Sequence, residues 1–330
     1  MWFLSGPTWP AFGPAWKITN SPMEQVACNL CGVDDSAPLF AGRDRLLGVP
    51  FGTETFCWVR CRRCGLIYLN PRPSLAEMPR YYPANYEPFT RRERTGGGLG
   101  YRLAVAKKCR IAGRGLGSGR LLDVGCGSGD FMLGMRERGW QGYGLDISPE
   151  AVNLARRNGL EVFLGQLLEA PFERYSFDLV TMWDVLEHLH DPAAYLAQVA
   201  RLLKPGGRFV VTLPNPRSVD FCLFGPVWTG LDVPRHLYVF GRPVLSALFH
   251  QAGLKVSAAR CIIGGQRVST WSLEWLIDER VARQGMRRFL KWAIYTPAWY
   301  CLWRPWYFAL DLLGLGSSIT YTCAVDEGAS

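Results

Sequence analysis

Apolar and polar positions alternate in short segments from residue 120 onward. The expected elements are, in order, a strand at Arg120 to Val124, a helix from Phe131, the strand "GYGLD", a helix from Pro149 to Asn158, a strand near Val162, the strand "FDLVTMW", a helix from Asp191 to Leu203 and the strand "GRFVVTL". Strands that alternate with helices predict a mostly parallel sheet with helices on both faces, and ligands then bind beyond the carboxyl ends of the strands. The expected fold class is α/β, doubly wound and Rossmann-like.

The first strand runs into "LLDVGCGSGDF", in which Gly125, Gly127 and Gly129 occupy alternate positions. Three alternate glycines cannot continue a strand, so the chain is expected to turn there and to begin a helix near Asp130. In a dinucleotide-binding fingerprint a glycine would stand where Asp130 stands, and a carboxylate at that position would repel a diphosphate. The loop therefore favours a ligand without phosphate groups at this point.

The acidic residues of this region suit a cofactor that carries positive charge and a ribose. Asp123 and Asp130 lie at the loop, and Asp146 ends the next strand, where a carboxylate can accept hydrogen bonds from both ribose hydroxyls. S-adenosylmethionine is such a cofactor, because it carries a sulfonium and an ammonium in place of phosphates.

The segments "LLDVGCGSGDF", "GLDIS", "FDLVTMWDVLEHLHDP" and "LKPGGRFVVTLPN" together resemble the motifs of class I S-adenosylmethionine-dependent methyltransferases, in the same order. The resemblance implies that the three glycines admit the cofactor, that Asp123 supports the loop and the cofactor's amino group, and that Asp146 holds the ribose. The segment "GQLLEAPF" matches the one that borders adenine. Gln166 stands there in place of the acid of many relatives, and its amide oxygen can accept the same hydrogen bond.

Methyl transfer from a sulfonium needs an aligned acceptor and, for a hydroxyl or carbon acid, removal of a proton. The segment "WDVLEHL" follows the fourth strand, so Trp183 and Asp184 are expected near the cofactor's sulfur. Asp184, Glu187 and His188 resemble the "ExxEH" cluster of ubiquinone-pathway O-methyltransferases, which is associated there with metal and membrane. The alternative is that Glu187 and His188 cap or orient the local helix and that Asp184 borders the cofactor.

A second candidate for catalysis is "DVPRHLYVF", which follows the fifth strand. His236 is a candidate general base near neutral pH, and Arg235 or Tyr238 could position an anionic or hydroxylated acceptor. The alternative for His236 is a structural hydrogen bond. A "PRHLY" segment of this type resembles one in methyltransferases that carry a zinc knuckle.

Two cysteine pairs with matching spacing precede the methyltransferase motifs. Cys28 and Cys31 in "CNLCG" and Cys61 and Cys64 in "CRRCG" are each separated by two residues and followed by glycine. Two such knuckles supply the four sulfurs of a tetrahedral zinc site, which is closed to substrate and therefore structural. Buried or redox-active thiols are the alternative.

The motifs also predict how the chain is divided. We expect a disordered segment or an over-extended start at residues 1–22, a zinc-knuckle domain at 23–90, a linker at 91–118 that includes "RRERTGGGLG", and the methyltransferase domain at 119–330. A helical insert at about residues 264–316 interrupts the sheet before its last strand, "SSITYTCA".

The insert interleaves tryptophan and tyrosine with basic residues, namely Arg287, Arg288, Lys291 and Arg304. This composition is typical of a surface that meets a membrane interface, and the alternative is a helical lid whose aromatic residues pack on the core. Pro297 and Pro305 argue against a membrane-spanning helix in this segment.

Net charge and the N-terminus bound the function further. The formal net charge of +9 indicates an anionic partner, such as a nucleotide-linked substrate, a membrane or nucleic acid. The first residues lack the regions of a signal peptide, so the eleven cysteines are expected as thiols or metal ligands in a reducing cytoplasm. We expect a cytoplasmic protein, with membrane association through the insert as an option.

The leading hypothesis is methyl transfer to a small-molecule acceptor: a sugar, a nucleotide sugar, a lipid-linked saccharide or a quinone-like lipid. An RNA methyltransferase is the first alternative, because a zinc ribbon and a basic surface also occur together in ribosomal RNA enzymes. The second alternative is a cofactor-binding module that docks a partner without chemistry.

Overall fold

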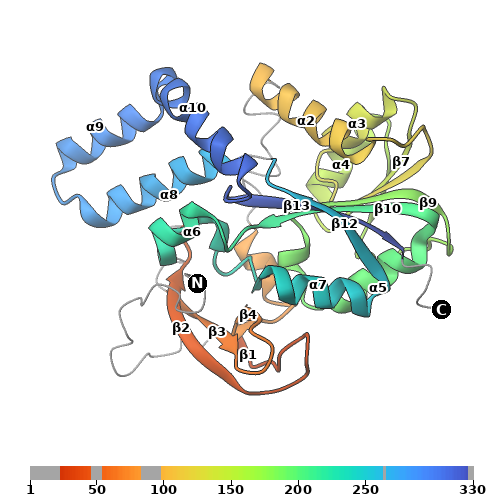
Figure 1. The fold of residues 1–330 in the computed structure, drawn as a ribbon, viewed down its shortest axis with the longest axis horizontal. Helices are drawn as coiled ribbons and strands as arrows, with labels where there is room; N and C mark the ends of the chain where they lie inside the picture. The colour runs from red at the N-terminus through yellow and green to blue at the C-terminus, as the bar shows by residue number, and fades with distance from the viewer. Residues whose placement is uncertain (1–22, 46–53, 83–97, 263–264, 326–330) are drawn as a thin grey trace. The chain divides into compact units, whose positions relative to one another are not determined.

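The computed structural model describes residues 23–45, 54–82, 98–262 and 265–325 (Figure 1). These residues fall into two compact units. The first unit contains the described residues up to Tyr81 together with Leu213–Leu245 and Arg260–Ile319, and the second contains Tyr82–Thr212, Ser246–Ala259 and the residues from Thr320. The prediction for residues 1–22 lies outside the described residues, and the domain boundaries expected from the sequence stay a prediction.

The described strands are β1 (Met23–Glu24), β2 (Ser36–Arg43), β3 (Thr55–Cys61), β4 (Ile67–Leu69), β5 (Arg72–Pro73), β6 (Arg120–Val124), β7 (Gln141–Asp146), β8 (Glu161–Leu164), β9 (Phe177–Trp183), β10 (Leu203–Pro214), β11 (Tyr238–Val239), β12 (Leu254–Arg260) and β13 (Ser318–Val325). The described α-helices are α2 (Leu99–Ala112), α3 (Asp130–Arg136), α4 (Pro149–Arg157), α5 (Pro192–Leu202), α6 (Val219–Phe224), α7 (Arg242–Gln251), α8 (Gly265–Arg280), α9 (Gln284–Ile294) and α10 (Pro297–Leu312). Short 3-10 helices lie at Met78–Tyr81, Leu186–His188, Gly225–Val227 and Thr229–Leu231.

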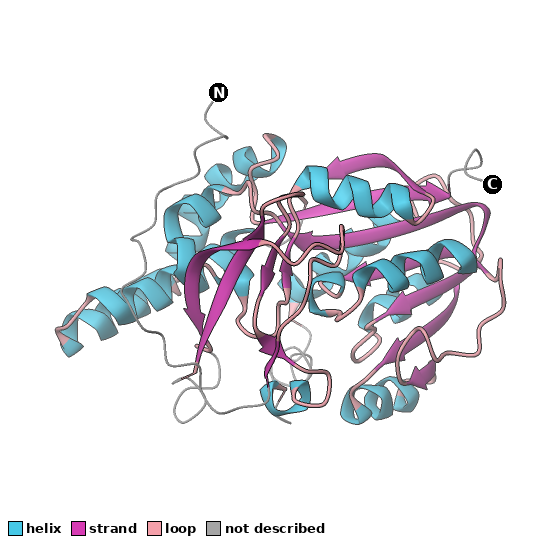
Figure 2. Ribbon diagram, turned by 90° about the horizontal axis from the view of Figure 1, so that it is seen from below, coloured by secondary structure: helices cyan, strands magenta, loops and turns pink. Residues whose placement is uncertain are grey.

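Seven of the described strands form one sheet in the order β12-β13-β10-β9-β6-β7-β8, and most of its residues belong to the second unit. The pairs β10/β9, β9/β6, β6/β7 and β7/β8 are parallel. Leu121 and Leu122 of β6 and Leu179 and Val180 of β9 are fully buried, as expected for central strands that helices cover on both faces (Figure 2). The sheet confirms the predicted doubly wound α/β class.

Two helices of this unit begin with the local signals that the sequence shows. The side chains of Ser148 and Asp191 each accept a backbone N–H of the following turn, at 3.2 and 3.0 Å. Pro149 and Pro192 occupy the first position of α4 and α5, where a missing N–H costs nothing. The first and last residues of α4 and α5 consequently lie within one residue of the predicted bounds.

Helix α2 differs from the sequence expectation, because it occupies most of the described part of the segment expected as a linker, 91–118. The sequence of this helix lacks the apolar periodicity that predicts a helix, and only its Cys109 and Ala112 are buried. In the segment "RRERTGGGLG", expected as a flexible joint, residues 91–97 lie outside the described residues, and α2 begins at Leu99.

The first unit contains a four-stranded sheet in the order β11-β4-β3-β2, whose neighbouring strands are antiparallel. Strand β11 comes from the segment that follows β10, yet Tyr238 pairs with Tyr68 of β4. The fully buried Trp58 and Tyr68 lie in this sheet. A segment distant in sequence thus completes the sheet that follows the cysteine pairs.

A buried ion-pair network joins these segments of the first unit. The fully buried guanidinium of Arg235 donates to both carboxylate oxygens of Asp44, at 2.9 and 3.0 Å, and also to Asp232. A further bond reaches the carbonyl of Tyr81 at 3.2 Å. Since the whole side chain is engaged internally, Arg235 acts as a structural clamp in this unit and not as a ligand for an acceptor.

The insert before β13 is helical, as predicted, and consists of α8, α9 and α10, which contact one another. Pro297 occupies the first turn of α10, whereas Pro305 lies inside that helix without ending it. Within the part of the chain that the structure describes, no helix combines the length and apolar character that crossing a bilayer requires.

Candidate functional site

The glycine loop between β6 and α3 adopts a backbone that favours glycine at three positions. Gly125, Gly127 and Gly129 have φ angles of 70°, 54° and 82°. A Cβ at Gly125 would lie 2.6 Å from the Val185 side chain and one at Gly129 would lie 2.1 Å from Leu160, whereas Gly127 has nothing within 4 Å. The outer glycines therefore permit close packing, and Gly127 leaves an open surface at which a ligand can approach the backbone.

Asp146 holds this loop against the end of β7. Its carboxylate accepts the backbone N–H of Gly127 at 2.8 Å and that of Ser148 at 2.9 Å, one on each oxygen. Burial raises the pKa of Asp146, and these backbone hydrogen bonds act against the shift. Each oxygen retains a further lone pair, so the carboxylate can also accept the two hydroxyls of a ribose.

Asp123 is a buried acid at the end of β6. The hydroxyl of Thr181 donates to it at 2.6 Å. Burial raises the pKa of Asp123 to about 7, while the Thr181 hydrogen bond and the positive charge of Lys108 lower it. A buried carboxylate is costly when it ionises without a neighbouring cation. A ligand ammonium would offset that cost.

Trp183 ends β9 and lies among groups that a ligand could contact. Its ring makes an edge contact with Phe131, with centroids 5.2 Å apart, and the ammonium of Lys108 lies 4.8 Å from its centroid. Its indole N–H is buried and has no hydrogen-bond partner among the described residues. A buried donor of this kind usually has a partner, which a ligand can supply.

Gln166 follows β8 in the segment expected to border adenine. The hydroxyl of Tyr195 donates to its side-chain oxygen at 2.9 Å, which fixes the amide. The neighbouring positions Ile147 and Leu168 carry exposed apolar side chains, 64% and 48% exposed. Such side chains can cover the faces of an adenine ring, and the sequence analysis did not single them out.

The segment after β9 turns at Asp184. This exposed residue has a φ angle of 59°, which aspartate adopts more readily than most residues, and its N–H donates to the carbonyl of Thr212 at 3.1 Å. Nearby, Glu187 is buried, and His188 Nδ1 lies 2.9 Å from the Tyr82 hydroxyl.

His236 and Tyr238 lie in the first unit. His236 is 8% exposed, and its Nδ1 lies 2.9 Å from the carbonyl of Gly230. Since a carbonyl only accepts, Nδ1 carries the proton, and neutral His236 then has its lone pair on Nε2. The Tyr238 hydroxyl accepts a hydrogen bond from Arg72 at 2.8 Å. The catalytic roles of His236, Tyr238 and Asp184 stay predictions.

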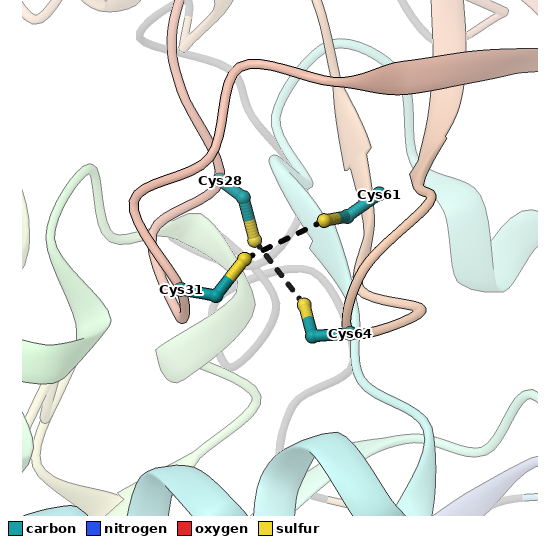
Figure 3. Close-up of side chains that lie close together, drawn as sticks. All are labelled: Cys28, Cys31, Cys61 and Cys64. Carbon is teal, nitrogen blue, oxygen red and sulfur yellow. Dashed lines mark hydrogen bonds between the residues drawn. The ribbon is translucent and has the colours of Figure 1, made fainter.

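The four predicted cysteines come together in the first unit (Figure 3). Their sulfurs all lie within 4.8 Å of one another, with 3.3 Å between those of Cys28 and Cys64 and 3.6 Å between those of Cys31 and Cys61. Four sulfurs bound to zinc would be about 3.8 Å apart, from Zn–S bonds of about 2.3 Å. The donor set therefore fits a structural zinc ion.

Both cysteine loops have the same backbone pattern. The N–H of the glycine after each pair bonds the carbonyl of the first cysteine of that pair, at 2.8 Å for Gly32 and 3.0 Å for Gly65. Both glycines have positive φ angles, 68° and 79°. Burial raises the pKa of the Cys28 and Cys64 thiols. At Cys61 the backbone N–H groups of Cys64 and Arg63 outweigh burial and lower the pKa to about 7. Within this group, Cys61 is therefore the thiol that ionises most readily.

The residues in the second unit fit S-adenosylmethionine. The carboxylate of Asp123 can pair with its ammonium, and the carboxylate of Asp146 can accept hydrogen bonds from its ribose. Gly127 leaves the backbone of the loop accessible. Sequence reasoning missed Lys108, because α2 lies in the segment expected as a linker. The only sequence signal for a basic group at this site was the pair of adjacent lysines, Lys107 and Lys108, before β6.

The comparisons with known proteins agree with this geometry. Residues 95–259, half of the chain, match the family described as "Methyltransferase domain". The chain is 40% identical over 154 residues to the ubiquinone biosynthesis O-methyltransferase of Xanthomonas oryzae pv. oryzae (strain PXO99A), a match that covers 43% of this chain and 64% of the relative. It is 38% identical over 122 residues to that of Alkalilimnicola ehrlichii, covering 34% and 49%.

The matches thus span less than two thirds of the length of these relatives. Among solved structures, a methyltransferase from Thermotoga maritima is 18% identical, with a TM-score of 0.47 over 72% of this chain and 98% of that one. The family match and the motif order confirm the predicted resemblance. The chain belongs to the methyltransferase domain family, as a class I S-adenosylmethionine-dependent methyltransferase.

Proposed function

We propose that this methyltransferase acts on a small amphiphilic acceptor, a quinone-like lipid, and that it reaches this acceptor through peripheral contact with a membrane. The name shared by the relatives, ubiquinone biosynthesis O-methyltransferase, supports this acceptor class. The single observation that carries the enzymatic part is the hydrogen bond from the Gly127 N–H of the glycine loop to Asp146 at the end of β7, with the buried Asp123 on the neighbouring strand β6. Sugars and nucleotide sugars are the competing acceptors.

S-adenosylmethionine supplies the electrophilic methyl group, which passes from the sulfonium to the acceptor oxygen in one in-line displacement. The residues of this chain hold and orient the reactants and accept the proton that the acceptor hydroxyl loses. We assign the proton to Nε2 of His236, which carries the lone pair when Nδ1 donates to Gly230. Tyr238 would then orient the acceptor, and Asp184 and Trp183 would border the cofactor.

We further propose that Cys28, Cys31, Cys61 and Cys64 bind one zinc ion. The support is the close approach of the four sulfurs, all within 4.8 Å of one another, and the repeated glycine turn in both loops. A site with four protein sulfurs has no open position for substrate, so its role is to stabilise the first unit.

The acceptor class can be tested with S-adenosylmethionine that carries a tritiated methyl group. The zinc-loaded enzyme and the labelled cofactor are added to an extract of the native organism, which is then separated into lipid, water-soluble and RNA fractions. We expect label in the lipid fraction, and none with the Asp146→Ala variant. Label in the water-soluble fraction would reassign the acceptor to a sugar or nucleotide sugar, and label in RNA would overturn the small-molecule proposal.

A second prediction concerns Lys108, whose ammonium lies over Trp183 and acts on Asp123. We propose that it binds the carboxylate of the cofactor's methionine group. Lys108→Met should therefore weaken cofactor binding about tenfold, because a hydrogen bond to a charged group contributes about 1.5–3 kcal/mol and this side chain is partly exposed. Isothermal titration calorimetry measures the change. The adjacent, exposed Lys107→Met is the matched control, and equal affinities of the two variants would contradict the assignment.

A further inference from the structure

Helix α9 presents its apolar side to solvent. Phe289 and Trp292, three residues apart and therefore on one face, are each more than half exposed. The charged side of the helix instead points to α8, where the ammonium of Lys291 lies 2.7 Å from Glu274 and 3.0 Å from Asp278. A helix at the surface of a water-soluble protein normally has the opposite arrangement. The apolar face of α9 therefore lacks an intramolecular role.

Helix α10 shows the same feature over a longer stretch. All residues of "CLWRPW", 301–306, are exposed, and Leu302, Trp306, Phe308 and Leu312 are each more than half exposed. Near the C-terminal end of this helix, Leu310 is buried. The solvent side of α10 is thus apolar along the helix, with Arg304 as its charged group.

We call the exposed side chains of these two helices the aromatic surface, namely Phe289, Trp292, Leu302, Trp306, Phe308 and Leu312. Helices α9 and α10 contact each other and belong to the same unit. Exposed apolar patches of this extent on a soluble protein mark a site for a partner or a membrane.

The charges around the aromatic surface are mostly positive. Residues 281–312 contain five basic residues, of which Arg283, Arg288 and Arg304 are exposed, and one acid, the half-buried Asp311. The acids of the preceding helix are engaged locally, as Glu274 and Asp278 pair with Lys291. The surface is therefore complementary to an anionic partner.

We propose that the aromatic surface docks on an anionic lipid bilayer, with its rings at headgroup depth and its arginines against lipid phosphates. Tryptophan beside arginine on helices that lie in the membrane plane suits such an interface. Six of the thirteen tryptophans of the chain lie in residues 271–306. This inference deepens the proposed membrane contact by naming the surface and the lipid charge, and it does not rest on the identity of the acceptor.

Vesicle flotation of the full-length, zinc-loaded protein tests the proposal. The vesicles contain phosphatidylcholine alone or mixed with phosphatidylglycerol, and no methyl acceptor. We expect binding to the anionic vesicles and at least tenfold weaker binding to neutral ones. Trp292→Ser with Trp306→Ser should weaken binding to anionic vesicles at least about tenfold, since burial of an aromatic side chain contributes about 1.5–3 kcal/mol. Arg288→Gln with Arg304→Gln should weaken it roughly thirtyfold, because each basic residue loses its attraction to the anionic surface.

The matched control is Leu75→Ser, which removes an equally exposed apolar side chain outside the insert and should leave vesicle binding unchanged. Thermal unfolding and cofactor binding establish that each variant is folded. Absence of vesicle binding by the unmodified protein, or equal binding by all variants, would overturn the proposal. Sedimentation velocity without lipid gives a further test. The proposal would also be overturned if the unmodified protein formed a dimer that the tryptophan variants abolish, while those variants still bound vesicles. A failure of vesicle binding would remove the proposed membrane contact, but it would not alter the proposal of methyl transfer, because the vesicles hold no acceptor.

Discussion

Cys28→Ser should cost the first unit its folded structure, and a strong chelator should have the same effect on the unmodified protein. Structural zinc sites contribute about 10–16 kcal/mol of apparent binding free energy at neutral pH, whereas a whole domain is stable by about 5–15 kcal/mol. The four sulfurs of this site are drawn together from two loops, 28–31 and 61–64. The ion would tie these two loops to each other, beside the ladder that pairs β2 with β3.

The measurement combines metal analysis with thermal unfolding. We expect one zinc per chain, a loss of the ion in Cys28→Ser, and a fall of the melting temperature by more than about 10 °C, given that 1 kcal/mol corresponds to a few degrees for a unit of this size. Cys57→Ser is the matched control, since Cys57 lies on β3 near the site but outside the four-sulfur group. A metal-free Cys28→Ser protein that melts with the unmodified one would refute the structural role.

The elements of the second unit were predictable because their signals are local. The apolar run of β6, the glycines after it and the cap-proline pairs at Ser148 and Asp191 each determine structure within a few residues. The same holds for the cysteine pairs, whose spacing and glycine turns define the site before any fold is known. Their close approach in the structure agrees with that prediction.

The set of segments that form the first unit was not predictable in this way, because it depends on contacts between residues far apart in the sequence. Nothing near Tyr238 in the sequence indicates that it pairs with Tyr68, and nothing near Asp44 indicates that it meets Arg235. The sequence analysis therefore considered Arg235 for acceptor binding, whereas its buried ion pairs give it a structural role. Pairing between remote strands is set by tertiary packing and not by local propensity.

Asp146→Ala should weaken cofactor binding at least about a hundredfold while leaving the fold intact. The carboxylate anchors the Gly127 N–H and the Ser148 N–H, and it is the group proposed to accept both ribose hydroxyls. Hydrogen bonds that involve a charged group contribute about 1.5–3 kcal/mol each, so the loss of two of them already accounts for this factor. Isothermal titration calorimetry with S-adenosylmethionine measures the change in affinity.

Thermal unfolding without cofactor separates this effect from a loss of structure. Burial raises the pKa of Asp146, so its contribution to stability is largest at low pH, where the group is protonated, and falls as pH rises past its unfolded value. Asp146 should therefore contribute less to the free energy of unfolding at neutral pH than at low pH. Asp178→Asn, at the opposite end of the sheet and paired with Lys204, should keep full affinity. An Asp146→Ala protein that binds the cofactor normally would show that the ribose is held elsewhere.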